Sequence, residues 1–184
     1  MKLKLLVSLL AVLSFFGATA HAQETPKVDI FAGYSYLREN PSTAGVSSFN
    51  LNGGSASIAY NAKSWLSGVA DFGGYHNGNI LSTGIPGTLS TYLFGPRVSY
   101  RHFGRLTPFG EALFGVAHAS GAGTSGSDNA FAMTVGGGLD YKLSDHFAIR
   151  PVKVDYLMTR FSETGTSNQT QNNLRVSTGI VFRF

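Results

Sequence analysis

The sequence has no cysteine among its 184 residues. A disulfide framework and a thiolate metal site are therefore both excluded. Basic residues do not cluster either, because the 14 Lys and Arg are scattered along the chain and nearly balanced by 10 Asp and Glu. This balance gives no indication of a nucleic-acid partner. Beyond residue 16, no segment approaches the about 18 consecutive apolar residues of a transmembrane helix, so a helical span is not expected.

The N-terminus has the three parts of a secretory signal peptide. The first four residues carry two lysines, residues 5–16 are apolar apart from two serines, and an A-x-A cleavage site ends at Ala22. The apolar run is shorter than the about 20 residues of a membrane anchor helix. We expect a cleaved signal peptide at 1–22 and a mature domain at 23–184, and loss of both lysines lowers the net charge from +4 to +2.

The mature sequence alternates between two kinds of residue with the period of a β-strand. The alternation is clearest in the last segment, where Leu174, Val176 and Ile180 fall on one face and Arg175 and Ser177 on the other. The sequence predicts eight strands, at about residues 27–37, 49–61, 65–75, 88–101, 107–119, 129–141, 146–161 and 173–184.

The connections between these segments are expected to alternate in length. The first, third, fifth and seventh have about 10–12 residues and the others about 4–5, a pattern typical of an up-and-down transmembrane barrel with both termini in the periplasm. Lipid offers no hydrogen-bond partner to an open sheet edge, so the sheet must close. The fold class predicted is therefore all-β, an eight-stranded antiparallel up-and-down transmembrane β-barrel.

Aromatic residues are expected to form two belts at the membrane interfaces. The predicted periplasmic belt contains Tyr60, Trp65, Tyr100, Phe103, Tyr141, Phe147, Phe182 and Phe184. The predicted outer belt contains Tyr36, Phe49, Tyr75, Tyr92, Phe131 and Phe161. The belts favour a membrane barrel over a soluble secreted barrel, in which the apolar face would point inward.

The last residues carry the most specific motif. Ser177, Gly179, Phe182 and Phe184 match the spacing of a polar residue, a glycine and two aromatics, and so resemble the C-terminal β-signal of outer-membrane barrels. With residues 31–36 and 93–97, this motif makes the chain resemble the small outer-membrane β-barrel family typified by the OmpA transmembrane domain and OmpX. The resemblance implies an outer-membrane location, contact with lipid or lipopolysaccharide, and recognition of the last strand by the assembly machinery. It leaves the activity open.

Charged residues share one face of each strand with Gly, Ser and Thr, and we expect that face to line the lumen. The predicted lumen ion-pair network consists of Asp29, Asp71, Arg97, Glu111, Asp140, Lys153, Asp155, Arg175 and Arg183. Reflection about Gly104 places Arg97 opposite Glu111. The last hairpin brings Arg175 diagonally near Asp155, and closure of the barrel brings Arg183 near Asp29. A barrel of eight strands has room only for side chains, and buried charges need partners.

Two prolines are expected to interrupt the regular ladder. Pro96 has no N–H to donate, so a bulge or an unpaired position is predicted there. Arg150 occupies a position that, by strict alternation, lies on the apolar face of its strand. Either a bulge at Pro151 resets the phase, or Arg150 extends to the membrane interface.

One enzymatic alternative arises from His118 and Ser120, whose spacing resembles the H-x-S pair of outer-membrane lipid A deacylases. Asp128 would then orient the histidine. The glutamate expected about a dozen residues after the serine is missing, since position 132 is alanine. No histidine pair has metal-ligand spacing, so no metal and no cofactor are predicted. The run Gly136–Gly138 is expected to let large neighbours pack or the wall bend.

The sequence thus predicts a non-enzymatic outer-membrane barrel, monomeric, with a lumen plugged by side chains. Its role is expected to be structural, or to be surface interaction through four extracellular loops, because loops on a rigid scaffold often carry binding. A narrow passive pore for small solutes is the alternative, and a lipid A-modifying hydrolase using His118 and Ser120 is a further one. The loops are small and polar and identify no ligand.

Overall fold

A computed structural model of the chain describes residues 25–41, 47–80, 86–121, 127–161 and 169–184. The predicted signal peptide at 1–22 lies outside these residues, as do the middles of the four long loops. The strands are β1 (Val28–Glu39), β2 (Phe49–Asn61), β3 (Leu66–Asn77), β4 (Gly87–Ser99), β5 (Leu106–Gly121), β6 (Ser127–Lys142), β7 (Phe147–Phe161) and β8 (Gln169–Arg183).

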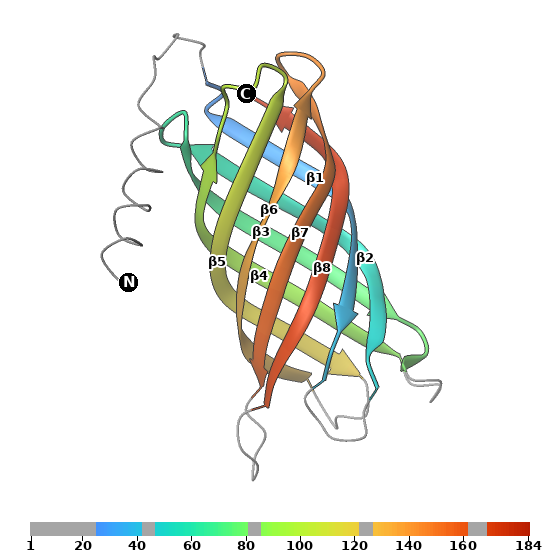
Figure 1. Ribbon diagram of the computed structural model, residues 1–184. Helices are drawn as coiled ribbons and strands as arrows, with labels where there is room; N and C mark the ends of the chain where they lie inside the picture. Colours follow the sequence, from blue (N-terminus) through green and yellow to red (C-terminus); the bar gives the residue numbers. More distant parts are fainter. Residues whose placement is uncertain (1–24, 42–46, 81–85, 122–126, 162–168) are drawn as a thin grey trace, which may run out of the picture.

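The eight strands form one closed antiparallel barrel in sequence order, which confirms the predicted fold class. Each strand pairs with its neighbours in the chain, and β1 closes the barrel against β8, with Asp29 opposite Arg183 and Gly33 opposite Gly179. Figure 1 shows the strands strongly tilted around a common axis, as closure of a sheet requires. No helix in the part of the chain that the structure describes is long and apolar enough to cross a membrane.

The two ends of the barrel differ in their connections. The turn end carries the short turns at residues 62–65, 100–105 and 143–146, together with the start of β1 and the end of β8. The loop end carries the connections at residues 40–48, 78–86, 122–126 and 162–168. Figure 1 shows the C-terminus and the start of β1 together at the turn end. The loop-end connections are shorter than predicted, because β1, β3, β4, β5, β6 and β8 all extend past their expected limits at this end.

Large apolar side chains cover the outside of the wall. On each strand they alternate with the buried residues that face the lumen, as with Tyr92, Phe94 and Val98 on β4 and Val154 and Tyr156 on β7. Such a surface suits contact with lipid and does not suit water, which rules against a soluble barrel. The outer aromatic belt is partly wrong, since Tyr75 points inward and is 1% exposed, and Phe49 packs against the interior cluster.

Both prolines interrupt the ladder, in different ways. The pairing of β4 with β5 stops at Gly95 and Pro96 and resumes at Arg97 in the same register, so Pro96 is unpaired toward β5 without a bulge, while it keeps its partner Gly68 on β3. Between Arg150 and Lys153 the register of β7 against β8 shifts, which is the bulge predicted at Pro151. This bulge turns Arg150 into the lumen, where it is fully buried, so the alternative of an interfacial Arg150 is wrong.

The interior is less polar than the sequence pattern indicates. A large apolar cluster fills part of the lumen, and apart from Ala59 and Val69 its members lie in the middle or the loop-end half of their strands. They include Leu37, Leu51, Tyr75, Leu89, Leu93, Leu113, Ala117, Ala130, Ala132 and Leu157. The inner face therefore holds large apolar residues beside the charged and small ones, because an enclosed lumen buries leucine as effectively as the lipid does.

Candidate functional site

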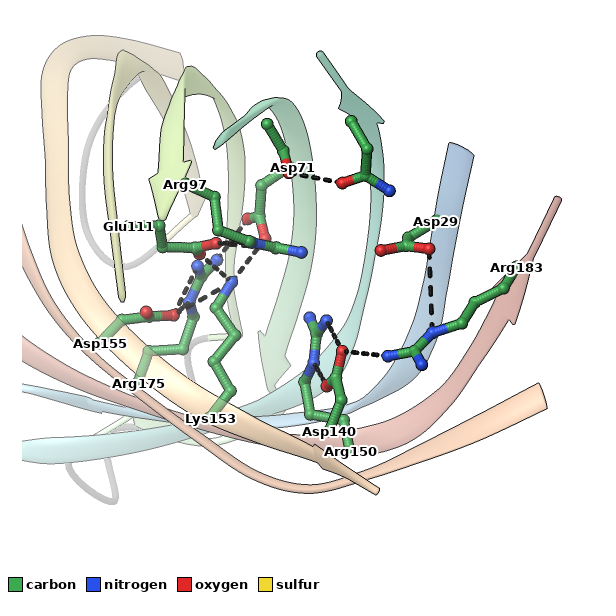
Figure 2. Close-up of polar contacts among 12 residues, drawn as sticks. Asp29, Asp71, Arg97, Glu111, Asp140, Arg150, Lys153, Asp155, Arg175 and Arg183 are labelled. Atoms are coloured by element: carbon green, nitrogen blue, oxygen red, sulfur yellow. Dashed lines mark hydrogen bonds and ion pairs between the residues drawn. The ribbon is translucent and has the colours of Figure 1, made fainter. Parts of the chain in front are cut away.

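All nine residues of the predicted network point into the lumen and are buried, at 5% exposure or less. They form two groups, which Figure 2 shows separated along the barrel. The central cluster contains Asp71, Arg97, Glu111, Lys153, Asp155 and Arg175. The turn-end cluster contains Asp29, Asp140 and Arg183, joined by two residues outside the predicted set, Arg101 and Arg150.

Arg97 and Glu111 form one edge of the central cluster. They lie opposite each other on β4 and β5, the position that reflection about Gly104 predicts. The guanidinium of Arg97 donates through Nε at 2.8 Å and approaches through Nη2 at 2.7 Å, both to Glu111 Oε2. A guanidinium that meets a carboxylate through two nitrogens is held in one orientation.

Lys153 joins the three carboxylates of the central cluster. Its Nζ lies 2.6 Å from Glu111 Oε1, 3.0 Å from Asp71 Oδ2 and 3.5 Å from Asp155 Oδ2. Arg175 binds two of the same groups, at 2.6 Å to Asp71 Oδ1 and 2.7 Å to Asp155 Oδ2. Arg175 and Asp155 are direct cross-strand partners instead of diagonal ones.

The charges of the central cluster balance, since three carboxylates meet three cations. Buried charges are costly to remove from water, and the penalty is offset when each has several opposite partners. Glycine makes room for this arrangement: Gly136 faces Asp155 across the β6–β7 ladder, and a side chain there would occupy the space of the Asp155 carboxylate. Gly138 likewise leaves room for the ring of Phe109.

The turn-end cluster is a chain of alternating charges. Arg101 Nη2 lies 3.1 Å from Asp29 Oδ2, and Arg183 lies 3.8 Å from the other oxygen of Asp29. Arg183 also reaches Asp140 at 3.5 Å, and Asp140 accepts two hydrogen bonds from Arg150, at 2.7 and 3.1 Å. The predicted proximity of Arg183 to Asp29 is present, but as a long contact within a larger group.

Arg150 also stacks between two aromatic rings. Its guanidinium carbon lies 4.5 Å from the centre of the Phe31 ring and 4.4 Å from that of Phe109. Phe109 in turn stacks on Arg97, at 4.5 Å, and so connects the two clusters. Guanidinium groups favour such faces.

The sequence gives a different signal for each of the two added arginines. Strict alternation along β7 would point Arg150 outward, and only a bulge at Pro151 predicts that it points into the lumen. Arg101 continues the alternation of Arg97 and Ser99, which predicts that it points inward.

Three residues of the C-terminal motif, Ser177, Gly179 and Phe182, lie on β8, and the fourth, Phe184, directly follows the strand. Ser177 is buried and its hydroxyl lies 2.6 Å from that of Ser35, while Gly179 lies at the β1–β8 junction. Phe182 packs against Phe147, with ring centres 5.2 Å apart, and Phe184 is 66% exposed. The backbone of Phe184 exchanges hydrogen bonds with Val28, which places the motif at the junction that completes the barrel.

His118 and Ser120 lie near the loop end on the outward parity of β5. His118 Nδ1 lies 2.8 Å from Asn129 Oδ1, its cross-strand neighbour, so an amide occupies the place that an orienting carboxylate would take. The side chain of Asp128 lies outside the described residues. The hydrolase alternative has no support from this geometry. Within the described ranges, no group of His, Asp and Glu is arranged to hold a metal ion.

A closed barrel of eight strands with an apolar exterior and a charged, enclosed interior defines the class of small outer-membrane β-barrel proteins. The sequence profile of the outer membrane protein beta-barrel domain matches residues 8–184. The chain belongs to this family, which is consistent with the resemblance drawn from its motifs and supports an outer-membrane location.

Solved structures of the same fold agree with this assignment. Neisserial surface protein A is similar with a TM-score of 0.66 at 15% identity, over 86% of this chain and 97% of that one. Ail, the attachment invasion locus protein of Yersinia pestis, has a TM-score of 0.54 at 20% identity, over 86% and 99%. OprG from Pseudomonas aeruginosa has a TM-score of 0.54 at 13% identity, over 87% and 96%. Among curated proteins, none matches this chain.

Proposed function

We propose that this protein is a closed outer-membrane scaffold whose lumen is plugged by its own side chains and does not conduct. The observation that supports this most directly is the burial of the charged lumen residues. Asp71, Asp155 and Arg175 are each 0% exposed. The wall of a water-filled channel would be accessible to solvent, whereas these groups are in contact with one another.

Two kinds of barrier lie in series along the lumen. The charged clusters occupy its turn-end and middle parts, and a solute would have to break several ion pairs to pass them. The apolar cluster around Leu37, Leu93 and Leu113 lies toward the loop end. Apolar constrictions exclude water and ions even where side chains leave a narrow gap. A passive pore, the alternative function, would need both barriers to open together.

The topology favours the loop end outside the cell and the turn end in the periplasm, because outer-membrane barrels have short periplasmic turns and longer outer loops. We propose that any interaction with other molecules takes place through these four loops, and that the barrel serves to hold them. Parts of each loop lie outside the described residues, so the proposal extends to no particular ligand. The recognition of β8 by the assembly machinery and a monomeric state belong to the same proposal, as does the absence of an enzymatic activity.

The closed lumen is tested by solute flux into vesicles. The mature protein is inserted into liposomes loaded with a dextran, and swelling is recorded in isosmotic arabinose. We expect no swelling above protein-free liposomes, with insertion shown by heat-modifiable gel mobility. An open porin inserted at the same protein-to-lipid ratio is the positive control. Swelling that scales with the amount of inserted protein would support the pore instead.

A further inference from the structure

The outer wall carries a shallow, open hollow at its turn-end half that is lined by apolar residues. It lies over β2, β3 and β4, has a volume of about 530 Å³, and is lined by Ile58, Tyr60, Gly68, Val69, Ala70, Phe72 and Gly95. The small residues of β3 form its floor. A side chain on Gly68 would meet no other atom within 4 Å, so the absence of one there leaves open space. Tyr60 is the cross-strand partner of Gly68, and Ile58 is the partner of Ala70. The side chains of Tyr60 and Ile58 therefore form one wall of the hollow, which we call the furrow.

A basic and aromatic turn, here called the rim, adjoins the strands that line the furrow. Residues 62–65 form the turn between β2 and β3, directly beyond Tyr60 and Gly68. In this turn the Lys63 ammonium lies 5.7 Å from the centre of the Trp65 ring. Trp65 and Tyr60 are 49% and 60% exposed, as expected of aromatic residues at a membrane interface.

Few negative charges oppose this rim. Of the side-chain carboxylates described at the turn end, Asp29 and Asp140 are buried, and Asp145 is paired with Lys142 at 2.7 Å. The hydrogen bond and charge of Lys142 hold the pKa of Asp145 below its ordinary value, so this turn presents a neutral pair. No described carboxylate lies within ion-pair distance of Lys63, Lys27 or Arg105, all of them exposed.

We propose that this part of the wall binds one anionic phospholipid of the leaflet at the turn end. An acyl chain lies in the furrow along Gly68 and Ala70, and the phosphate lies at Lys63, with Trp65 beside the glycerol region. An apolar furrow that leads to an exposed cation at the interface matches both parts of such a lipid. The site requires insertion in a bilayer but does not depend on whether the lumen conducts.

Trp65 is the single tryptophan of the chain and reports on this site. The protein is inserted into vesicles of phosphatidylcholine and phosphatidylglycerol in which one or the other is brominated in its acyl chains, and quenching of Trp65 gives the relative binding constant. We expect the anionic lipid to be preferred about fivefold, the effect of one basic side chain at a membrane surface, and the preference to fall with added salt.

Matched variants separate the two parts of the site. Lys63→Gln should reduce the preference to about one, whereas Lys142→Gln, which removes a paired cation from the opposite side of the barrel, should leave it unchanged. Gly68→Leu fills the furrow and should lower the maximal quenching by either lipid. Gly74→Leu, at an equally open position on the same strand, should not.

Three results would overturn the proposal. If both lipids quench Trp65 equally, and Lys63→Gln does not alter that quenching, the proposed site for an anionic headgroup does not exist. If Gly68→Leu leaves the quenching unchanged, no acyl chain binds in the furrow. Weak quenching that rises as the protein is diluted in lipid would show that a second copy of the chain covers this face. No quenching by any brominated lipid would contradict bilayer insertion itself, and swelling of liposomes would bear only on the lumen.

Discussion

Each buried cation of the central cluster has a particular set of oxygen partners, and single substitutions should reveal them. Arg97 depends on Glu111 alone among the carboxylates, whereas Lys153 is shared by three. Removal of one member of a buried pair leaves the other charge uncompensated, which typically costs about 3–5 kcal/mol.

Replacement of one partner of the Arg97–Glu111 pair should therefore be worse than replacement of both. We expect Arg97→Leu and Glu111→Leu each to lower the free energy of unfolding by about 3 kcal/mol, and the double variant to lose clearly less than the sum of the two. Urea unfolding in lipid vesicles, followed by Trp65 fluorescence, measures all three. Single variants that leave the unfolding midpoint untouched would show that this pair is not a buried ion pair.

Arg150 should not be replaceable by lysine, although the charge is kept. A lysine cannot donate two parallel hydrogen bonds to Asp140, and it stacks less well between Phe31 and Phe109. We expect Arg150→Lys to lower the free energy of unfolding by about 1–3 kcal/mol, measured in the same way. Arg160→Lys, an exposed position on the same strand, is the control and should behave as the parent does.

At this scale, sequence parity locates the lumen residues but not all of their partners. The nine predicted positions are inward because the period of two holds along each strand. The inward direction of Arg150 was only one of two alternatives, since it depends on where the β7 bulge falls. Lys153 contacts Asp155 within β7, but its contacts with Asp71 on β3 and Glu111 on β5 join non-neighbouring strands, and no single hairpin determines them.

At the scale of the strands, the junction of β1 and β8 requires the two backbones to lie close together. Gly33 and Gly179 are cross-strand partners there, and a Cβ on Gly179 would overlap the carbonyl oxygen of Ala32 and lie 2.9 Å from the ring of Phe31. The wall at this point has no space for a side chain, and backbone cannot give way as a flexible side chain does. The packing of the β1–β8 junction therefore requires a glycine at position 179, apart from any role of the C-terminal motif in recognition.

Gly179→Ala should slow or prevent closure of the barrel. We expect a lower yield of the heat-modifiable, compact form on detergent gels after refolding into lipid. Gly74→Ala, where the added methyl group meets no atom within 4 Å, should refold as the parent does. Equal yields for the two variants would mean that the junction tolerates expansion and that the glycine has another role.

The strands and their order could be predicted from the sequence, because alternation and turn residues are local signals. Their ends could not: β8 begins at Gln169 and β6 at Ser127, in stretches whose small polar residues look like loop. Such residues extend a strand when the neighbouring strand supplies hydrogen-bond partners, and this is a property of the closed sheet. Leu93 and Leu113 share the inward parity of Arg97 and Glu111, so alternation places them in the lumen, but only the closed barrel shows that they pack together there.

At the scale of the whole molecule, we propose that the barrel is closed along its axis. The charged clusters and the apolar cluster lie in series, and Figure 2 shows the charged side chains of facing walls meeting across the lumen. Closure is a property of all eight strands together, since Asp71 on β3, Lys153 on β7 and Arg175 on β8 reach one another only in the complete barrel.

The most direct test is the conductance of the refolded mature protein in a planar lipid bilayer, with insertion shown separately by gel mobility. The closed barrel predicts a silent membrane, with no steps above the baseline. A steady, defined conductance that changes with Lys153→Ala or Glu111→Ala would place a pore through the central cluster and contradict the plug.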